Sequence, residues 1–214
     1  MDESSGSAGG ASSNGGGSSI DAGSEWSSNP SPVTIAAASP SGSPTDGDGF
    51  LSKPAACGGK TVLDGDSCAG SGGIKLGPDW PCQNDVVYRA YLRFPLAQIV
   101  GTQPKKVTLR FSYVEHDQVS SPAVLFSIPD FGPLDASDWS IAPRAQLGQV
   151  LQVGTAYGPK ETDVTAAVLG ALAQDEAAAA FELRTESEST GGVGKWYCIA
   201  NSKTANPPQL YVEY

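Results

Sequence analysis

The chain has 214 residues and a formal net charge of −10, with 13 lysines and arginines against 23 aspartates and glutamates. It contains no basic run, and an acidic chain of this kind is a poor partner for nucleic acid or an anionic membrane surface. It also contains no apolar run long enough to predict a membrane span. We therefore expect no nucleic-acid partner and no membrane-spanning segment.

Residues 1–47 are mostly Gly, Ser, Ala, Asn, Pro and Asp, and Trp26 and Ile35 are among their few large apolar side chains. A segment of this composition cannot bury enough apolar surface to offset its loss of conformational entropy on folding. The composition therefore predicts a disordered linker or tether over residues 1–47. The remaining residues, 48–214, are enough for one domain with a single hydrophobic core.

The four cysteines, Cys57, Cys68, Cys82 and Cys198, include no C-x-x-C pair, and His116 is the one histidine. This pattern does not predict a zinc site. An even number of cysteines instead predicts two disulfides, which persist in an oxidising compartment. Of the three pairings that four cysteines allow, we expect Cys57–Cys68, which closes a short loop. The second bond, Cys82–Cys198, would tie the start of the first core strand to a late strand.

Disulfides predict that the protein is extracellular or lies on the outer cell surface. The first residues, MDESSGSAGG, contain no apolar segment typical of a signal peptide. We therefore expect an export signal upstream of this numbering. Many bacterial surface lipoproteins begin with a polar tether directly after the removed signal, so a lipid anchor upstream is a further hypothesis.

The stretch VYRAYLRFPL, residues 87–96, alternates between two kinds of side chain. One face carries Ala90, Leu92, Phe94 and Leu96, and the other carries Arg89, Tyr91 and Arg93. Strict alternation of this kind predicts a half-buried strand, with one face in a core and one face turned outward.

Residues 107–113, VTLRFSY, alternate in the same way, and turn-forming residues separate the segments that follow. Further strands are predicted over residues 123–128, 149–153, 180–185, 195–200 and 209–214. The segment TDVTAAVLGALA predicts a short helix over 164–173, with Asp163 or Thr165 as its cap. Together these elements predict an all-β fold, an antiparallel β-sandwich that is jelly-roll-like and has one short helix.

Five segments occur in a fixed order: YRAYLRFPL, KKVTLRFSYV, TDVTAAVLGAL, FELRTES and a closing PPQLYVEY. In this order they resemble the DNRLRE domain, a secreted β-sandwich module akin to carbohydrate-binding modules. The resemblance covers residues 48–214; the chain departs from it at Pro95, where the family usually has Asp, and in the cysteine-bearing N-terminal part. It implies a domain of bacterial or archaeal surface proteins or polysaccharide-degrading enzymes, and some relatives bind acidic polysaccharide.

The sequence does not predict an enzyme. His116 would have to serve in any Ser/His/Asp arrangement, yet the chain has no G-x-S-x-G motif. Nothing in the sequence selects a pair of carboxylates for glycoside hydrolysis. Two Asp-rich stretches, TDGDGF and LDGDSC, lack the glutamate that closes an EF-hand loop, so plain turns are expected. We expect no cofactor, with a structural calcium ion as the alternative.

Sugar binding requires flat aromatic rings and planar polar groups. Trp80 and Trp139 lie in Pro- and Asp-rich segments, where a tryptophan is less easily explained by a core, so they are candidate stacking residues. The favoured alternative is that such a loop tryptophan covers the end of the sandwich. Trp196, beside Cys198, is expected to pack against a disulfide.

Arg89, Tyr91, Arg93 and Arg110 form a second candidate set. They would share one face if strands 87–96 and 107–113 lay in one sheet, and bidentate arginine contacts suit uronate carboxylates. The favoured alternative is that these arginines pair with carboxylates on neighbouring strands, such as Glu182 and Glu213.

These observations predict a non-catalytic extracellular β-sandwich module that binds polysaccharide or another surface glycan. The alternative is a structural or adhesive surface domain that binds protein or self-associates. The long tether and the lack of a selective site in the sequence favour that alternative.

Overall fold

The computed structural model describes residues 31–37, 49–53, 62–63, 68, 73–80, 85–189 and 192–214, with the backbone alone at 62–63. All of them belong to one compact unit that begins at Ser31. The predicted tether over 1–47 therefore lies outside the described residues, except for 31–37.

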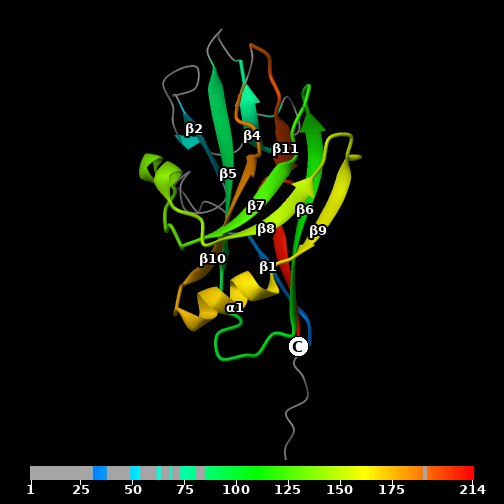
Figure 1. The fold of residues 1–214 in the computed structure, drawn as a ribbon. Coiled ribbons are helices and arrows are strands. Elements are labelled where there is room, and N and C mark those ends of the chain that lie inside the picture. The colour runs from blue at the N-terminus through cyan, green and yellow to red at the C-terminus, as the bar shows by residue number, and fades with distance from the viewer. Residues whose placement is uncertain are drawn as a thin grey trace, which may run out of the picture. The chain divides into compact units, whose positions relative to one another are not determined.

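The strands form an antiparallel β-sandwich of two sheets that is not closed into a barrel (Figure 1). Sheet A contains β1 (Val33–Ala36), β12 (Gln209–Glu213), β6 (Lys106–His116), β9 (Gly158–Asp163), β11 (Tyr197–Ala200) and the first half of β4 (Gly73–Asp79). Sheet B contains the second half of β4 with β2 (Gly49–Lys53), β3 (Val62–Leu63), β5 (Val86–Pro95), β10 (Ala178–Thr185), β7 (Ala123–Ile128) and β8 (Ala145–Leu151).

Successive strands cross between the sheets, since β5 lies in sheet B, β6 in sheet A and β7 in sheet B again. This alternation gives the fold its jelly-roll-like character. The predicted fold class, an all-β antiparallel sandwich with one short helix, is confirmed.

β4 joins the two sheets. Its first half pairs with β11, and its second half pairs with β5, where Gly77 lies opposite Tyr88. Gly77 has a φ of 109°, a conformation that favours glycine. A side chain at this position would also collide with the backbone of Lys195 and Trp196. Glycine is therefore required at the point where the chain passes from one sheet to the other.

The core lies between the sheets and is filled by alternate residues of the strands. Leu92 and Phe94 of β5 and Leu109 of β6 have no exposed surface. Phe94 packs edge-on against Phe181 of β10, with ring centroids 5.9 Å apart. The apolar face of 87–96 is therefore a core face, and burial of each such side chain contributes roughly 1.5–3 kcal/mol.

The helix α1 (Thr165–Ala173) confirms the helix predicted over 164–173 and closes one end of the sandwich (Figure 1). Asp163 accepts hydrogen bonds from the Thr165 amide at 2.9 Å and the Thr165 hydroxyl at 2.6 Å. The same hydroxyl accepts from the amide of Val107 at 2.8 Å, which ties the start of the helix to β6. No helix in the described ranges is long and apolar enough to span a membrane.

Residues 31–37 correct the expected domain boundary. β1 pairs with β12, with Val33 opposite Val212 and Ile35 opposite Leu210. Ile35 is 2% exposed and belongs to the main core. A strand of this length is not stable alone, so its conformation depends on pairing with β12, which the composition of residues 1–47 does not reveal.

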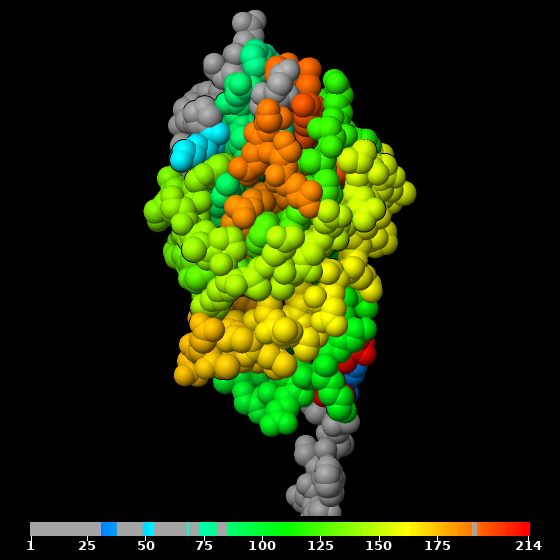
Figure 2. Space-filling view, in the orientation of Figure 1, coloured from blue at the N-terminus to red at the C-terminus, as the bar shows by residue number. Residues whose placement is uncertain are grey.

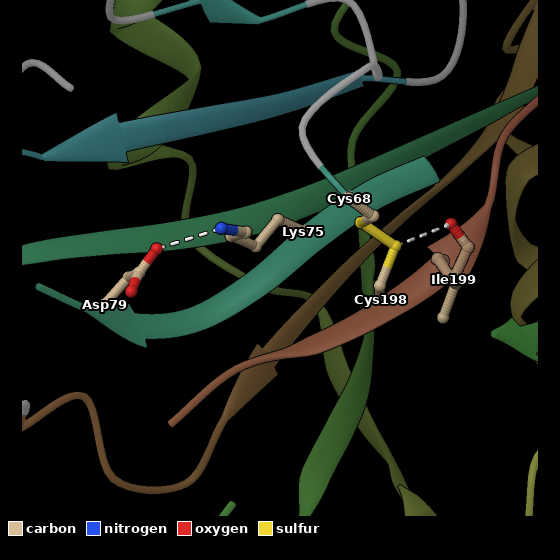
Figure 3. The surroundings of a disulfide bond; sticks show 5 residues. All are labelled: Cys68, Lys75, Asp79, Cys198 and Ile199. Carbon is tan, nitrogen blue, oxygen red and sulfur yellow. Dashed lines mark hydrogen bonds and ion pairs between the residues drawn. A yellow bond between two sulfur atoms is a disulfide. The ribbon is translucent and has the colours of Figure 1, made fainter. Parts of the chain in front are cut away.

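A disulfide joins Cys68 to Cys198 of β11, with Cα atoms 6.3 Å apart (Figure 3). Both expected pairs, Cys57–Cys68 and Cys82–Cys198, are therefore wrong, because each shares one cysteine with this bond. The reason is tertiary: β11 lies beside the start of β4, close to position 68 in the chain. Cys57 and Cys82 lie outside the described residues.

Candidate ligand-binding groove on the outer face of sheet B

The outer face of sheet B is partly covered by the segment 129–144, which connects β7 to β8 and which we call the covering segment. A second, smaller hydrophobic cluster lies beneath it. Its buried members are Leu51, Tyr91, Ile128, Leu134 and Ala180, and Phe131, Trp139 and Ile141 pack against them. The outward side of β5 therefore faces the covering segment around Tyr91.

A short 3-10 helix, η2 (Ala136–Ser140), shapes the covering segment. The Asp135 carboxylate accepts from the Ser137 amide at 2.7 Å, and the Asp138 carboxylate accepts from the Asp135 amide at 2.7 Å. These reciprocal bonds form a capping box. The Tyr91 hydroxyl donates to the Asp138 carbonyl oxygen at 3.3 Å and ties η2 to the sheet. Tyr91 has no exposed surface, because the covering segment packs over it.

Two arginines of β5 hold the segments above them. Arg93 donates from Nε and Nη2 to the two carboxylate oxygens of Asp130, at 2.7 and 2.9 Å. Arg89 donates in the same way to Glu188, at 2.8 and 3.0 Å, and its guanidinium lies 4.2 Å from the ring centroid of Trp139. Both guanidinium groups are therefore already engaged with carboxylates.

Beside the covering segment, the outer face of sheet B is hollowed into a groove of about 440 Å³, which we call the sheet B groove. The residues that line it are Val124, Phe126, Gln146, Arg184, Thr185, Glu186 and Glu188. In Figure 2 the orange surface of the residues after β10 adjoins the yellow-green surface of β8, where these segments meet. These residues come from β7, β8, β10 and the loop after β10, and most of them are polar.

Arg184 is the cation in this lining. Its guanidinium lies 4.2 Å from the ring centroid of Phe126, and its nearest carboxylate is that of Glu182, with Nη1 3.6 Å from Oε1. That distance is too long for a hydrogen bond. Contact with an aromatic ring restricts an arginine side chain, so its N–H groups are available to a ligand at little entropic cost.

Glu182 lies two residues before Arg184 in β10, between Tyr91 of β5 and Phe126 of β7. Its side chain has no exposed surface, and among the described residues neither carboxylate oxygen has a hydrogen-bond partner. Arg89 Nη1 lies 3.5 Å from the same oxygen that faces Arg184. Burial raises the pKa of the Glu182 carboxyl, although the two arginines oppose that rise.

The rim of the groove adds acceptors and an amide. The Gln149 side-chain amide donates to Glu186 at 2.7 Å, and Glu188 is positioned by Arg89. The groove thus contains the N–H donors of Arg184, the carboxylate and amide oxygens of its glutamates and Gln146, and the ring of Phe126. Because sugar hydroxyls both donate and accept hydrogen bonds, such a mixed lining suits a polyhydroxylated ligand.

The structure separates the candidate residues that the sequence suggested. Arg89, Tyr91, Arg93 and Trp139 lie together on or against the outer face of sheet B. Arg110 does not join them, because β5 and β6 belong to different sheets.

Arg110 lies on sheet A, where it pairs with Glu161 at 2.9 Å and its guanidinium lies 4.0 Å from the ring centroid of Tyr211. Trp80 follows β4, is 39% exposed and does not line the sheet B groove. Its amide donates to Asp79 at 2.8 Å.

The expected ion pairs are confirmed for Glu182 and wrong for Glu213. Glu182 lies near Arg89 and Arg184, whereas Glu213 pairs with Lys106 at 3.8 Å. Trp196, directly before β11, lies beneath Lys75 of β4, whose ammonium nitrogen is 4.3 Å from the centroid of the Trp196 ring. Lys75 also donates to Asp79 at 2.9 Å (Figure 3).

Sequence reasoning missed most residues that line the groove, in particular Arg184, Glu188 and Gln146. Alternation in the strand predicted over 180–185 could have placed Arg184 on the same outward face as Glu182. Nothing in the sequence identifies Glu188 or Gln146, because their place in the groove depends on how the loop after β10 and the start of β8 meet.

Among the described residues, no group of three or more His, Cys, Asp or Glu side chains is arranged to hold a metal ion. His116 is exposed and stacks on Tyr113, with ring centroids 5.9 Å apart. Comparison with known protein families finds no match for this chain, and no curated protein is similar to it in sequence.

Proposed function

We propose that this protein is a non-catalytic extracellular module that binds polysaccharide at the cell surface, and that the sheet B groove is its binding site. The observation that carries the proposal is the lining of the groove, in which the Arg184 guanidinium lies over the Phe126 ring beside carboxylate and amide groups. Sugars are bound by such planar polar groups, held in place before the ligand arrives. The resemblance to the DNRLRE domain supports the same proposal.

The carboxylates at the groove favour binding over hydrolysis. Glu188 is held by Arg89, Glu186 accepts from Gln149, and Glu182 has no exposed surface. A glycosidase requires one carboxyl group as acid and a second as nucleophile or base, both in contact with the sugar. Release of reducing sugar from any polysaccharide would contradict the non-catalytic part of the proposal.

The disulfide between Cys68 and Cys198 supports an extracellular location, because such bonds are rare in reducing compartments. A lipid anchor upstream of this numbering remains part of the proposal. The codons that precede Met1 test it, since a lipoprotein would have an apolar signal segment followed by cysteine.

Affinity electrophoresis tests the proposed binding, with xylan, mixed-linkage β-glucan, pectin or alginate in the gel. We expect retardation of the full chain by at least one of them, and Arg184→Ala should reduce it about tenfold or more in apparent affinity, since charge-assisted hydrogen bonds are worth roughly 1.5–3 kcal/mol. Arg110→Ala, on sheet A, is the matched control and should bind as the wild type does. Equal losses in the two variants would place the site elsewhere.

A second candidate function is protein binding or self-association, favoured by the end of the sandwich near α1. The helix has no charged residue, and Leu169 is 40% exposed. Val100, in the neighbouring loop, is 65% exposed, and a mostly apolar hollow of about 560 Å³ lies between this loop and the end of the helix. Light scattering with Leu169→Glu tests this candidate: a monomeric wild-type protein would count against self-association.

A further inference from the structure

A buried glutamate, Glu182, lies next to Arg184, which lines the sheet B groove. Glu182 has no exposed surface and lies at the centre of the outer face of sheet B, with no hydrogen bond to either carboxylate oxygen from a described residue. Removing an ionised carboxylate from water is costly unless nearby cations balance it. Arg89 and Arg184 supply that balance at 3.5 and 3.6 Å, by charge and not by hydrogen bonds.

The two arginines depend on Glu182 to different degrees. Arg89 has a two-pronged pair with Glu188 and also donates to the Trp139 carbonyl oxygen at 3.3 Å, so it keeps partners without Glu182. Arg184 has one ionic partner among the described residues, Glu182, and otherwise lies on the Phe126 ring. Loss of the negative charge on Glu182 therefore affects mainly Arg184, which lines the groove.

We propose that Glu182 is an acid-sensitive positioning residue: as an anion it holds Arg184 in the binding geometry, and on taking up a proton it releases Arg184 and weakens ligand binding. This inference rests on the proposed function of the groove. It adds a mechanism by which a fall in pH detaches the module from its polysaccharide.

The charges around Glu182 support proton uptake above the ordinary range of a glutamate. Burial raises the pKa of its carboxyl most strongly, Arg89 and Arg184 oppose the rise, and Glu188 adds to it. Tyr91 from β5 also faces Glu182 and has its own pKa raised, first by burial and then by Glu182. The negative charge of Asp138, in η2, also raises the pKa of Tyr91, so a second carboxylate lies on the Tyr91 side of Glu182. From β7, the side chain that faces Glu182 is the uncharged Phe126.

Two measurements on the full chain test the inference. The first follows the carboxyl carbon of Glu182 by carbon-13 NMR through a pH titration, without any ligand. The second compares polysaccharide affinity at neutral pH and at a lower pH that is still above the ordinary glutamate pKa of about 4.3, in gels that contain xylan, mixed-linkage β-glucan, pectin or alginate. We expect the carboxyl to titrate above its ordinary range and wild-type affinity to fall about tenfold between the two pH values.

Glu182→Gln should bind about tenfold more weakly than the wild type at the higher pH and show no further loss at the lower one, because its amide carries no charge to lose. Glu161→Gln, which removes a carboxylate on sheet A, is the control and should keep the wild-type pH profile. Arg184→Gln supplies a second variant: it should also bind weakly at both pH values, even if Glu182→Gln folds poorly.

An acid profile in Glu182→Gln equal to that of the wild type would overturn the inference, as would a carboxyl that titrates in the ordinary range. If no polysaccharide binds at either pH, the proposed function fails, and with it the link to ligand release. The carbon-13 titration then still decides whether Glu182 takes up a proton above the ordinary glutamate range.

Discussion

Arg93 of β5 and Asp130, directly after β7, form a two-pronged ion pair across 37 positions of sequence. The pair clamps the beginning of the covering segment onto the outer face of sheet B. This segment covers Tyr91, whereas the sheet B groove is lined by residues of β7, β8, β10 and the loop after β10.

Asp130→Asn should lower the free energy of unfolding at neutral pH by roughly 1–3 kcal/mol, because it weakens a largely buried charged pair. Burial acts to raise the pKa of Asp130, but hydrogen bonds from Arg93 and the Gly132 amide outweigh it and hold the pKa below its usual range. This stabilisation is present above the ordinary aspartate pKa and is lost as the pH falls through the lower folded-state value.

Urea unfolding from neutral pH to about pH 3 measures this loss, which should be smaller in Asp130→Asn than in the wild type. Asp175→Asn changes an exposed aspartate after α1 and serves as the control, with the wild-type profile expected. Parallel profiles in all three proteins would show that the clamp contributes no pH-dependent stability.

Gly77→Ala should destabilise the fold more than Gly148→Ala does. The two glycines have φ values of 109° and 122°, so both substitutions incur backbone strain, roughly 1–2 kcal/mol. An added Cβ at Gly77 would also lie 2.8 Å from the Lys195 carbonyl oxygen, whereas Gly148 has open space. Thermal unfolding of the two variants compares backbone strain alone, at Gly148, with backbone strain plus a steric collision, at Gly77. Equal destabilisation would contradict the close contact between Gly77 and Lys195.

Non-reducing peptide mapping should recover the pair Cys68–Cys198. Replacing Cys198 by serine should cost about 2–5 kcal/mol of stability, since it frees a long loop in the unfolded chain. Recovery of a peptide that links Cys82 to Cys198 would contradict the structure at β11.

Gly170→Ala should stabilise the protein by about 0.5–1 kcal/mol, because alanine is the better residue within a helix. An added Cβ at Gly170 meets no atom within 4 Å, so no collision offsets the gain. Gly101→Ala is the control: its site is equally open, but its φ of 77° makes the same substitution unfavourable. Thermal unfolding should therefore show shifts of opposite sign.

Several strands escape prediction for a shared physical reason. β4 contains two glycines and a proline, and β9, GPKETD, is nearly all polar, so neither has the apolar alternation of a half-buried strand. β9 is a strand because it pairs with β6, with Thr108 opposite Asp163. Such pairing depends on a partner that is distant in the sequence.

Side-chain periodicity is enough to predict the sandwich, the strand within 87–96 and the helix near 164–173, because it decides which residues share a face. It also predicts that arginines lie opposite the core face of β5. What lies above these arginines depends on tertiary contacts: the covering segment buries Tyr91, and Asp130 and Glu188 engage Arg93 and Arg89. Periodicity predicts which side chains share a face of a strand. The groove beside Arg184 is formed by β7, β8, β10 and the loop after β10, which come together only when the chain folds.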